Sequence, residues 1–168
     1  MKIEIRTWRM ADAPSLAKAL DNKKLHENLR DGLPFPYTVS DAEDYISAML
    51  SADCEQTYVW AITVNNVAVG SISAFRKDNI HRLTAEMGYY LAEEYWGKGV
   101  MTEVIKQVCG YIFVNTDIVR IFAEPFADNT ASCRVLEKVG FVCEGTLRKN
   151  AIKNGNLIDT KLYAILKA

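Results

Sequence analysis

The stretch that decides the fold is Glu94-Tyr95-Trp96-Gly97-Lys98-Gly99-Val100-Met101-Thr102, which lies between a strand-like run and a strongly periodic helix. Its two glycines, one residue apart, stand where the helix begins, so the backbone can approach a ligand closely and direct several free N–H groups toward it. The helix dipole adds partial positive charge at the same end. The pattern therefore predicts a cradle for a phosphate or pyrophosphate.

Two common phosphate loops do not fit this stretch. A nucleoside-triphosphate loop needs Lys-Ser or Lys-Thr after its second glycine, and a dinucleotide fingerprint needs a third glycine where this chain has Thr102. A dinucleotide-binding unit also begins with a strand, the glycine loop and a helix, whereas this loop follows a predicted β-hairpin. Neither nucleotide class is therefore expected as the ligand.

Length and composition limit the function classes. The chain has 168 residues, of which 49% are apolar, and a net formal charge of −1, so a nucleic-acid partner has no electrostatic support. No apolar run is long enough to cross a membrane, and the first residues lead directly into a strand. We expect one domain covering residues 1–168, located in the cytoplasm, without a nucleic-acid or membrane partner.

The cysteines and histidines do not indicate a metal site. Four cysteines have no Cys-x-x-Cys spacing, and the two histidines are far apart in the sequence. Cys109 falls on the apolar face of a predicted helix and fits a core position. Cys133 is the thiol nearest the segments expected to hold the ligand. No metal is therefore predicted.

Runs rich in β-forming residues predict seven strands, three of which form an antiparallel meander with Asn65-Asn66 as one of its tight turns. The predicted strands are Lys2–Trp8, Thr57–Val64, Val67–Phe75, Thr84–Leu91, Asp117–Glu124, Phe141–Arg148 and Leu157–Leu166. The meander comprises the second, third and fourth of these. Asn154-Gly155-Asn156 is expected to turn the chain between the last two.

Helical spacing of apolar residues, with capping residues, predicts the helices between these strands. The clearest helix follows the glycine loop, with an apolar stripe of Val100, Met101, Val104, Ile105, Val108, Cys109, Ile112 and Phe113. Asp12 with Pro14, and Ser40 with Glu43, indicate two helix starts. Asn22 to Arg30 fits a short charged helix. Asp128-Asn129 begins another helix, which Gly140 ends.

The glycine stretch resembles the Gly-x-Gly loop of the GNAT acetyltransferases, in the version of the branch that acetylates N-termini of ribosomal proteins. Other segments resemble this branch in the same order, namely Leu33 to Ala42, Ala85 to Leu91, Asn129 to Phe141 and Glu144 to Arg148. The resemblance covers nearly the whole chain and implies the GNAT fold. That fold is a mixed α/β domain with a mostly antiparallel sheet of about seven strands flanked by helices, in which strands four and five splay apart.

This resemblance implies acetyl-CoA as cosubstrate and assigns its binding residues. The pyrophosphate would be held by N–H groups of Trp96, Gly97, Lys98, Gly99, Val100, Met101 and Thr102. Asn129 and Ser132 match positions that bind the pantetheine and phosphate arm, although both also fit simple capping of a helix. The pantetheine would pair with the backbone of Met87, Tyr89 and Leu91.

The implied reaction is acetyl transfer to a primary amine, which must first lose a proton. Glu86 is our candidate general base, and a solvated strand glutamate is the alternative reading. Phe35 and Tyr37 lie in the loop that resembles the acceptor side of the family. The chain departs from the family at Glu94, where Arg or Gln is usual, and at Leu136, where many members carry the tyrosine that protonates the CoA thiolate.

Those departures leave several alternatives. Tyr90 and Cys133 are weak candidates for the general acid, and the thiolate could also leave unassisted. The acceptor by resemblance is a protein N-terminus, with a polyamine, free amino acid or amino sugar as the alternative. A non-catalytic acyl-CoA-binding module is the second hypothesis, supported by Glu94 and the missing tyrosine. We expect a monomer or a homodimer.

Overall fold

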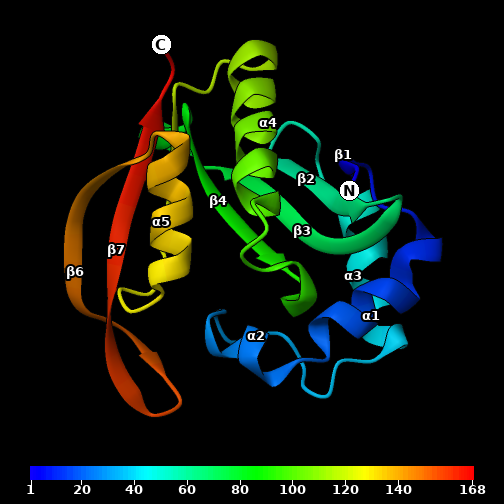
Figure 1. The fold of residues 1–168 in the computed structure, drawn as a ribbon. Helices are drawn as coiled ribbons and strands as arrows, with labels where there is room; N and C mark the ends of the chain where they lie inside the picture. Colours follow the sequence, from blue (N-terminus) through cyan, green and yellow to red (C-terminus); the bar gives the residue numbers. More distant parts are fainter.

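The computed structural model describes all residues, 1–168, and arranges seven strands in the order β1-β2-β3-β4-β5-β7-β6 (Figure 1). The strands are β1 (Ile3–Arg6), β2 (Thr57–Val64), β3 (Val67–Arg76), β4 (Thr84–Leu91), β5 (Arg120–Ala123), β6 (Val142–Lys153) and β7 (Asn156–Leu166). The helices are α1 (Ala13–Leu20), α2 (Lys23–Glu27), α3 (Val39–Leu50), α4 (Val100–Asn115) and α5 (Thr130–Val139). The mixed, mostly antiparallel sheet flanked by helices that the sequence predicts is confirmed.

The antiparallel meander β2-β3-β4 is present as predicted. The tight turn between β2 and β3 contains Asn65 and Asn66, whose φ angles are 48° and 68°. Asparagine tolerates this left-handed region better than most residues, so the pair suits a hairpin turn. β3 and β4 pair in continuous register from Gly70 opposite Leu91 to Arg76 opposite Ala85. Because no bulge interrupts β4, its side chains alternate between the two faces of the sheet throughout.

β4 and β5 form the one parallel pair of the sheet, and the pairing is short. Cα partners run only from Thr84 opposite Arg120 to Glu86 opposite Phe122. Beyond Glu86, β4 continues to Leu91 paired with β3 alone. The splaying of strands four and five is therefore confirmed, and it leaves the β5-facing edge of residues 87–91 without a strand partner.

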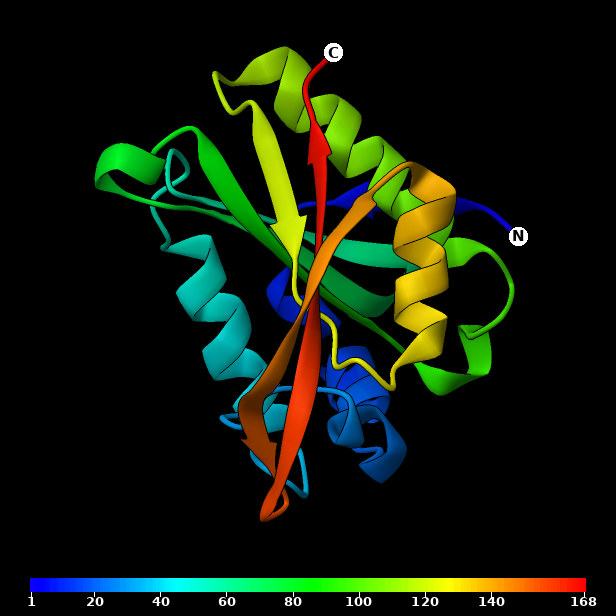
Figure 2. The same ribbon diagram turned by 90° about the vertical axis from the view of Figure 1, so that its left-hand side faces the viewer.

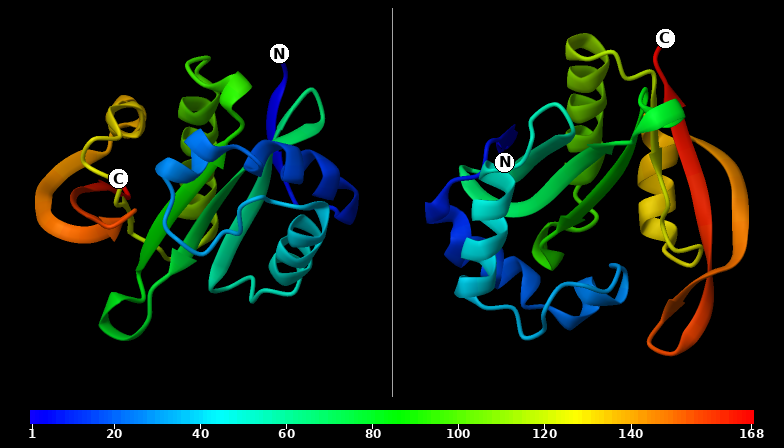
Figure 3. Two further views of the ribbon diagram at one scale, coloured as in Figure 1. Left: turned by 90° about the horizontal axis from the view of Figure 1, so that it is seen from below. Right: turned by 180° about the vertical axis from the view of Figure 1, so that it is seen from behind.

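Two helical layers cover the sheet, α4 and α5 on one face and α1 and α3 on the other (Figure 2). The predicted stripe of α4 is buried as far as Ile112, in a core that also contains Leu136 of α5 and Met87 of β4. A smaller core on the opposite face joins α1 and α3 to Trp8 and Tyr37. The segment after α2 lies near the tip of the β6–β7 hairpin, where Lys153 Nζ is 2.8 Å from Asp31 Oδ1 (Figure 3).

The start of α3 differs from the prediction by two residues. The capping box consists of Thr38 and Asp41 rather than Ser40 and Glu43. Thr38 Oγ1 accepts a hydrogen bond from the Asp41 N–H (3.2 Å), and Asp41 Oδ2 accepts one from the Thr38 N–H (2.8 Å). Thr38 is extended (φ −100°, ψ 166°), the conformation that an N-cap requires. Ser40 lies within the first turn instead.

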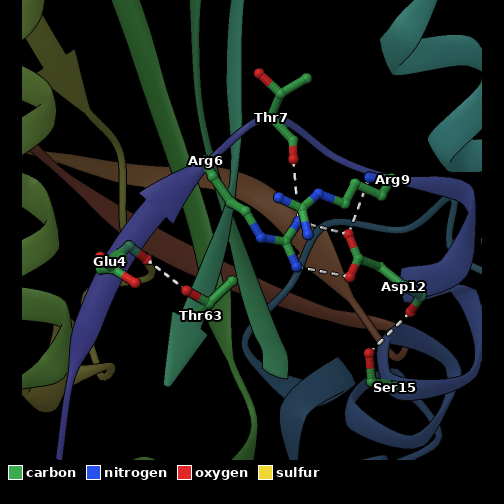
Figure 4. Close-up of polar contacts among 7 residues, drawn as sticks. All are labelled: Glu4, Arg6, Thr7, Arg9, Asp12, Ser15 and Thr63. Atoms are coloured by element: carbon green, nitrogen blue, oxygen red, sulfur yellow. Dashed lines mark hydrogen bonds and ion pairs between the residues drawn. The ribbon is translucent and has the colours of Figure 1, made fainter. Parts of the chain in front are cut away.

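The predicted cap Asp12 has a different role at the junction of β1 and α1 (Figure 4). Its carboxylate makes no cap hydrogen bond to α1. It accepts two hydrogen bonds from the Arg6 guanidinium, both 2.8 Å, and one from the Arg9 N–H at 2.9 Å. Burial alone raises the pKa of the Asp12 carboxyl, but the hydrogen bonds and charges of Arg6 and Arg9 outweigh burial, so the pKa is lowered.

The last two strands are longer than the prediction, and β5 is shorter. β6 and β7 meet at a turn of Asn154 and Gly155, with φ angles of 51° and 77°. Their register shifts between Leu147 and Ala151. β5 ends at Ala123 instead of Glu124. Glu124 is therefore free of the strand and lies where the chain turns toward α5.

Candidate functional site

The glycine loop presents a row of free backbone donors at the start of α4. Gly97 and Gly99 have φ angles of 71° and 77°, and Gly99 is the N-cap of the helix. None of the N–H groups from Gly97 to Thr102 donates a hydrogen bond within the protein. Trp96 differs, because its N–H donates to the Glu93 oxygen at 3.0 Å. The cradle for an anion thus extends over residues 97–102.

Side chains next to the loop hold it and add charge. Trp96 Nε1 donates a 2.7 Å hydrogen bond to the Leu91 oxygen, which ties the loop to the end of β4. Lys98 Nζ lies 5.6 Å from the centre of the Tyr95 ring and is solvent-exposed, so its charge is available beside the free N–H groups. Glu94 is also exposed. Lys98 is therefore the one cation of the loop that can face an anionic ligand.

The first turn of α5 approaches β4 through two hydroxyl groups. Asn129 caps α5, because its Oδ1 accepts a hydrogen bond from the Ser132 N–H at 3.3 Å. The Ser132 hydroxyl lies 2.6 Å from the Tyr89 hydroxyl. Burial raises the pKa of Tyr89 to about 12, although the Ser132 hydrogen bond opposes the shift. Asn129, Ser132 and Tyr89 are thus brought together on the α4 and α5 side of the sheet.

The remaining predicted contacts on β4 involve main chain rather than side chains. Met87 and Leu91 are buried in the core beneath α4. Their backbone, with that of Tyr89, belongs to the part of β4 that β5 does not pair. Such an edge offers N–H and C=O groups to an extended ligand. The structure therefore supplies the edge that the family resemblance predicts for a pantetheine chain.

Glu86 points to the opposite face of the sheet, into a cavity of about 410 Å³. We call this hollow the acceptor-side cavity. Its lining residues are Arg30, Lys77, Glu86, Phe122, Glu124, Phe126, Asn150, Ala151 and Thr160. Two strands and the β6–β7 hairpin supply most of its wall, and Arg30 comes from the segment after α2.

Charged side chains of both signs meet in the acceptor-side cavity. Arg30 Nη2 lies 2.5 Å from Glu86 Oε1 and 3.8 Å from Glu124 Oε2. Lys77 Nζ lies 3.9 Å from Glu86 Oε2 and 5.9 Å from the centre of the Phe122 ring. A carboxylate in such a place can attract an ammonium group and accept a proton from it.

A wider hollow of about 680 Å³ follows residues 146–150 of β6. It is lined by Arg148 and Lys149 but by no carboxylate. A proton acceptor for an amine is therefore present in the acceptor-side cavity and absent from this hollow.

Several residues singled out in the sequence lie outside the acceptor-side cavity. Phe35 is exposed and packs its ring edge-on against His26 at 5.2 Å. Tyr37 is buried under α1 and α3, and burial, with the Asp41 charge, raises its pKa to about 12. The hydroxyl of Tyr90 is buried beside Tyr45, on the face opposite Tyr89. Neither Phe35 nor Tyr37 therefore lines the cavity.

Sequence reasoning missed the three other charged residues of the cavity, namely Arg30, Lys77 and Glu124. Glu124 carried one signal, because it directly follows β5, the strand that pairs in parallel with the strand of Glu86. Arg30 and Lys77 carried no such signal. Both lie in connecting segments, whose path depends on the tertiary fold.

Comparison with known proteins identifies the class to which this fold and site belong. The model of the acetyltransferase (GNAT) domain matches residues 2–142. The uncharacterised N-acetyltransferase YoaA of Bacillus subtilis (strain 168) is 41% identical over 99 residues, which cover 59% of this chain and 55% of YoaA. The chain therefore belongs to the GNAT acetyltransferase family, although the match spans only about half of that relative.

Two further comparisons extend over nearly the whole chain. The putative ribosomal N-acetyltransferase YdaF of B. subtilis (strain 168) is 28% identical over 171 residues, covering 98% of this chain and 91% of YdaF. The solved structure of the ribosomal L7/L12 α-N-protein acetyltransferase RimL, in complex with coenzyme A, superposes with a TM-score of 0.86. It is 23% identical and covers 99% of this chain and 94% of RimL, so the likeness shows a shared fold.

Two further findings concern metal-binding side chains and the length of the helices. No three side chains of the kinds that bind metals come together in the structure. No helix combines the length and apolar character needed to cross a membrane.

Proposed function

We propose that this protein transfers the acetyl group of acetyl-CoA to a primary amine, namely the α-amine of a peptide or protein N-terminus. The observation that carries the proposal is the pairing of two sites across the splayed strands. Free N–H groups of residues 97–102 lie on the α4 and α5 side, and a carboxylate-lined cavity lies on the other. Cosubstrate and acceptor would approach from opposite faces and meet where β4 leaves β5.

The cosubstrate fits the first of these sites. Its pyrophosphate would accept hydrogen bonds from the N–H groups of Gly97, Lys98, Gly99, Val100, Met101 and Thr102, with the α4 dipole behind them. Asn129 and Ser132 would contact the pantetheine and phosphate arm, and the main chain of Met87, Tyr89 and Leu91 would pair with the pantetheine. RimL, which shares the fold, holds coenzyme A in its structure.

The glycine cradle gives a direct prediction. Gly99→Ala forces a side chain into the left-handed region (φ 77°), so we expect a loss of about 1 kcal/mol in the free energy of unfolding. Relief of that strain would turn the N–H groups away, so acetyl-CoA binding should weaken too. Calorimetric titration with acetyl-CoA and thermal unfolding measure the two effects.

A matched control is Gly110→Ala on the same helix. Gly110 has no atom within 4 Å of an added Cβ and no positive φ. This change should raise stability by about 0.5–1 kcal/mol and leave binding unchanged. Equal binding of acetyl-CoA by the parent and Gly99→Ala would contradict the assigned cradle.

Glu86 is the proposed general base. In the reaction the ammonium group gives one proton to the Glu86 carboxylate directly or through water, and the neutral nitrogen attacks the thioester carbonyl. CoA leaves as its thiolate, and the second proton of the nitrogen passes to solvent. A main-chain N–H of the unpaired edge of β4 would donate to the developing oxyanion. Attack takes place in a ternary complex, without an acetylated enzyme.

The leaving thiolate needs little assistance. A thiol has a pKa of about 8.5, whereas the pKa of Tyr89 is raised to about 12 by burial. Full proton transfer from Tyr89 to the thiolate is therefore uphill, and this hydroxyl would act as a hydrogen-bond donor at most. Tyr90 faces the other core, with a pKa raised well above the ordinary value by burial. The general acid stays unassigned, and solvent can supply the proton.

The acceptor assignment rests on the relatives. YdaF is a putative ribosomal N-acetyltransferase, and RimL is an α-N-protein acetyltransferase of ribosomal L7/L12. An N-terminal amine also suits general-base catalysis, because its pKa of about 8 is lower than the value of about 10 for an alkyl amine. This acceptor class agrees with the cytoplasmic location expected from the sequence.

Mass spectrometry of a mixed pool tests the proposed function. The protein and acetyl-CoA are incubated with short peptides that differ in their first residue, together with polyamines, amino acids and amino sugars. We expect acetyl gain on peptide α-amines. Gain only on a small amine would contradict the acceptor assignment. No gain on any amine, with acetyl-CoA binding confirmed by calorimetry, would favour the non-catalytic acyl-CoA-binding module.

A further inference from the structure

The guanidinium of Arg30 occupies the place where an acceptor amine would have to meet Glu86. Its Nη2 contacts Glu86 Oε1 at 2.5 Å and approaches Glu124 Oε2 at 3.8 Å. A protonated amine that gives its proton to Glu86 needs the same carboxylate oxygens at a similar distance. Arg30 and the acceptor are therefore alternative partners of one pair of carboxylates.

The two carboxylates and the guanidinium are held very differently. Glu86 belongs to β4 and Glu124 directly follows β5, and their side chains are 21% and 24% exposed. Arg30 lies outside any helix or strand, and its side chain is 66% exposed. An exposed ion pair contributes little stability. The two carboxylates are thus held in place by β4 and by the end of β5, whereas the Arg30 guanidinium that contacts them can leave at small cost.

We propose that Arg30 is a displaceable occupant of the ammonium site formed by Glu86 and Glu124, and that the acceptor brings a single positive charge into this cavity. The inference rests on the proposed function. Arg30 stands in for the acceptor ammonium in the free protein, and the acceptor replaces it.

The charges of the cavity favour an acceptor with one cation. Arg30 and Lys77 balance Glu86 and Glu124 in the free protein. When Arg30 withdraws, one negative charge is left uncompensated, and one ammonium neutralises it. A polyamine would bring further ammonium groups toward Lys77 and the displaced Arg30, where like charges repel. Beside the charged pair, the cavity offers the apolar surface of Phe122 and Phe126 rather than a further carboxylate for a second ammonium group.

The test compares Arg30→Ala with Lys77→Ala, since each removes one positive charge from the cavity. The acceptor is the best peptide from the mixed pool. Arg30→Ala should lower the KM for the peptide about two- to fivefold, because the competing ion pair is gone. Methylguanidinium chloride should then inhibit Arg30→Ala competitively against the peptide. It should inhibit the parent and Lys77→Ala more weakly, because in both proteins Arg30 still fills the site.

Two results would overturn this role of Arg30. A higher KM in Arg30→Ala would mean that Arg30 binds the acceptor. Equal inhibition of Arg30→Ala and Lys77→Ala by methylguanidinium would mean that only the charge of the cavity matters. Peptide binding to the CoA-loaded protein, followed by calorimetry, gives the same comparison without turnover. It separates failure of this inference from failure of the proposed enzymatic function, which would appear as absence of acetyl transfer by the parent.

The substrate preference is tested on the parent protein alone. The peptide should have a kcat/KM at least about tenfold above that of spermidine, the difference that about 1.4 kcal/mol of charge repulsion produces. A preference for spermidine would overturn the one-cation acceptor.

Discussion

Replacing Glu86 by Gln is expected to lower kcat about 10²- to 10⁴-fold, the usual contribution of a positioned general base. Glutamine keeps the shape and the hydrogen-bonding capacity of the side chain but does not take up a proton at neutral pH. The affinity for acetyl-CoA should stay unchanged, because Glu86 points away from the glycine cradle on the other face of the sheet. Steady-state kinetics on a peptide acceptor and calorimetric titration with acetyl-CoA measure the two quantities.

Two matched variants make the result specific. Glu103→Gln changes an exposed glutamate on α4 that accepts a hydrogen bond from Gln107, so its kcat should equal that of the parent. Glu124→Gln changes the second carboxylate of the cavity and should raise the KM for the acceptor more than it lowers kcat. If Glu86→Gln acetylates as fast as the parent at every pH, the assignment of the base is wrong. A selective loss of kcat in Glu124→Gln would transfer the role to Glu124.

The parts of the site that the sequence predicts are those encoded by neighbouring residues. The glycine loop is an example, because two glycines and the apolar stripe after them define both the left-handed turns and the helix that follows. The Asn65-Asn66 turn and the strands on either side of it form another. In each case the signal and the structure lie within a few residues of each other.

The acceptor-side cavity could not be derived in that way. Glu86, Glu124 and Arg30 come from three separate segments, and only the parallel pairing of β4 with β5 and the path after α2 bring them together. The start of α3 shows a related limit. Thr38 with Asp41 and Ser40 with Glu43 both fit a capping box, and burial of Tyr37 just before the helix accompanies the earlier start. Local patterns give such alternatives, and tertiary packing selects one.

Asp12 stands at the N-cap position of α1, but its carboxylate pairs with Arg6 instead of capping the helix. Among the substitutions proposed for this protein, replacing Asp12 should have the largest effect on stability. Asp12→Ala leaves the Arg6 guanidinium, whose side chain is 18% exposed, without its carboxylate partner. The Nε of Arg6 has no partner either. Breaking a buried ion pair at one end costs about 3–5 kcal/mol. Because this pair is partly buried, we expect about 3 kcal/mol, seen as a fall in Tm of about 6–12 °C.

An ion pair of the same length, but with an exposed carboxylate, is the control. Arg76 Nη1 and Asp117 Oδ1 are also 2.8 Å apart, but the Asp117 side chain is 70% exposed. Asp117→Ala should therefore cost less than about 1 kcal/mol. Equal losses in Asp12→Ala and Asp117→Ala would contradict the special role of the Arg6–Asp12 pair.

The pH dependence of the Asp12 effect follows from the direction of its pKa shift. The pKa of Asp12 is lower in the folded protein than in the unfolded chain, because hydrogen bonds and charges from Arg6 and Arg9 outweigh the opposing effect of burial. Its contribution to stability is therefore complete above the unfolded value of about 3.9 and is lost as the pH falls through the lower folded value. The difference in unfolding free energy between the parent and Asp12→Ala, measured by denaturant titration, should be constant near neutrality and shrink below about pH 4.

A second substitution separates the cost of an unpaired charge from the value of the pair itself. Arg6→Met in the Asp12→Ala background removes the guanidinium that the first change leaves stranded, and methionine keeps apolar contacts beside β2. Replacing both partners of a buried pair by apolar groups is often close to neutral, whereas removing one is not. The double variant should therefore be more stable than Asp12→Ala alone. If it is less stable, the loss in Asp12→Ala comes from the hydrogen bond to the Arg9 N–H at the entry to α1 rather than from Arg6.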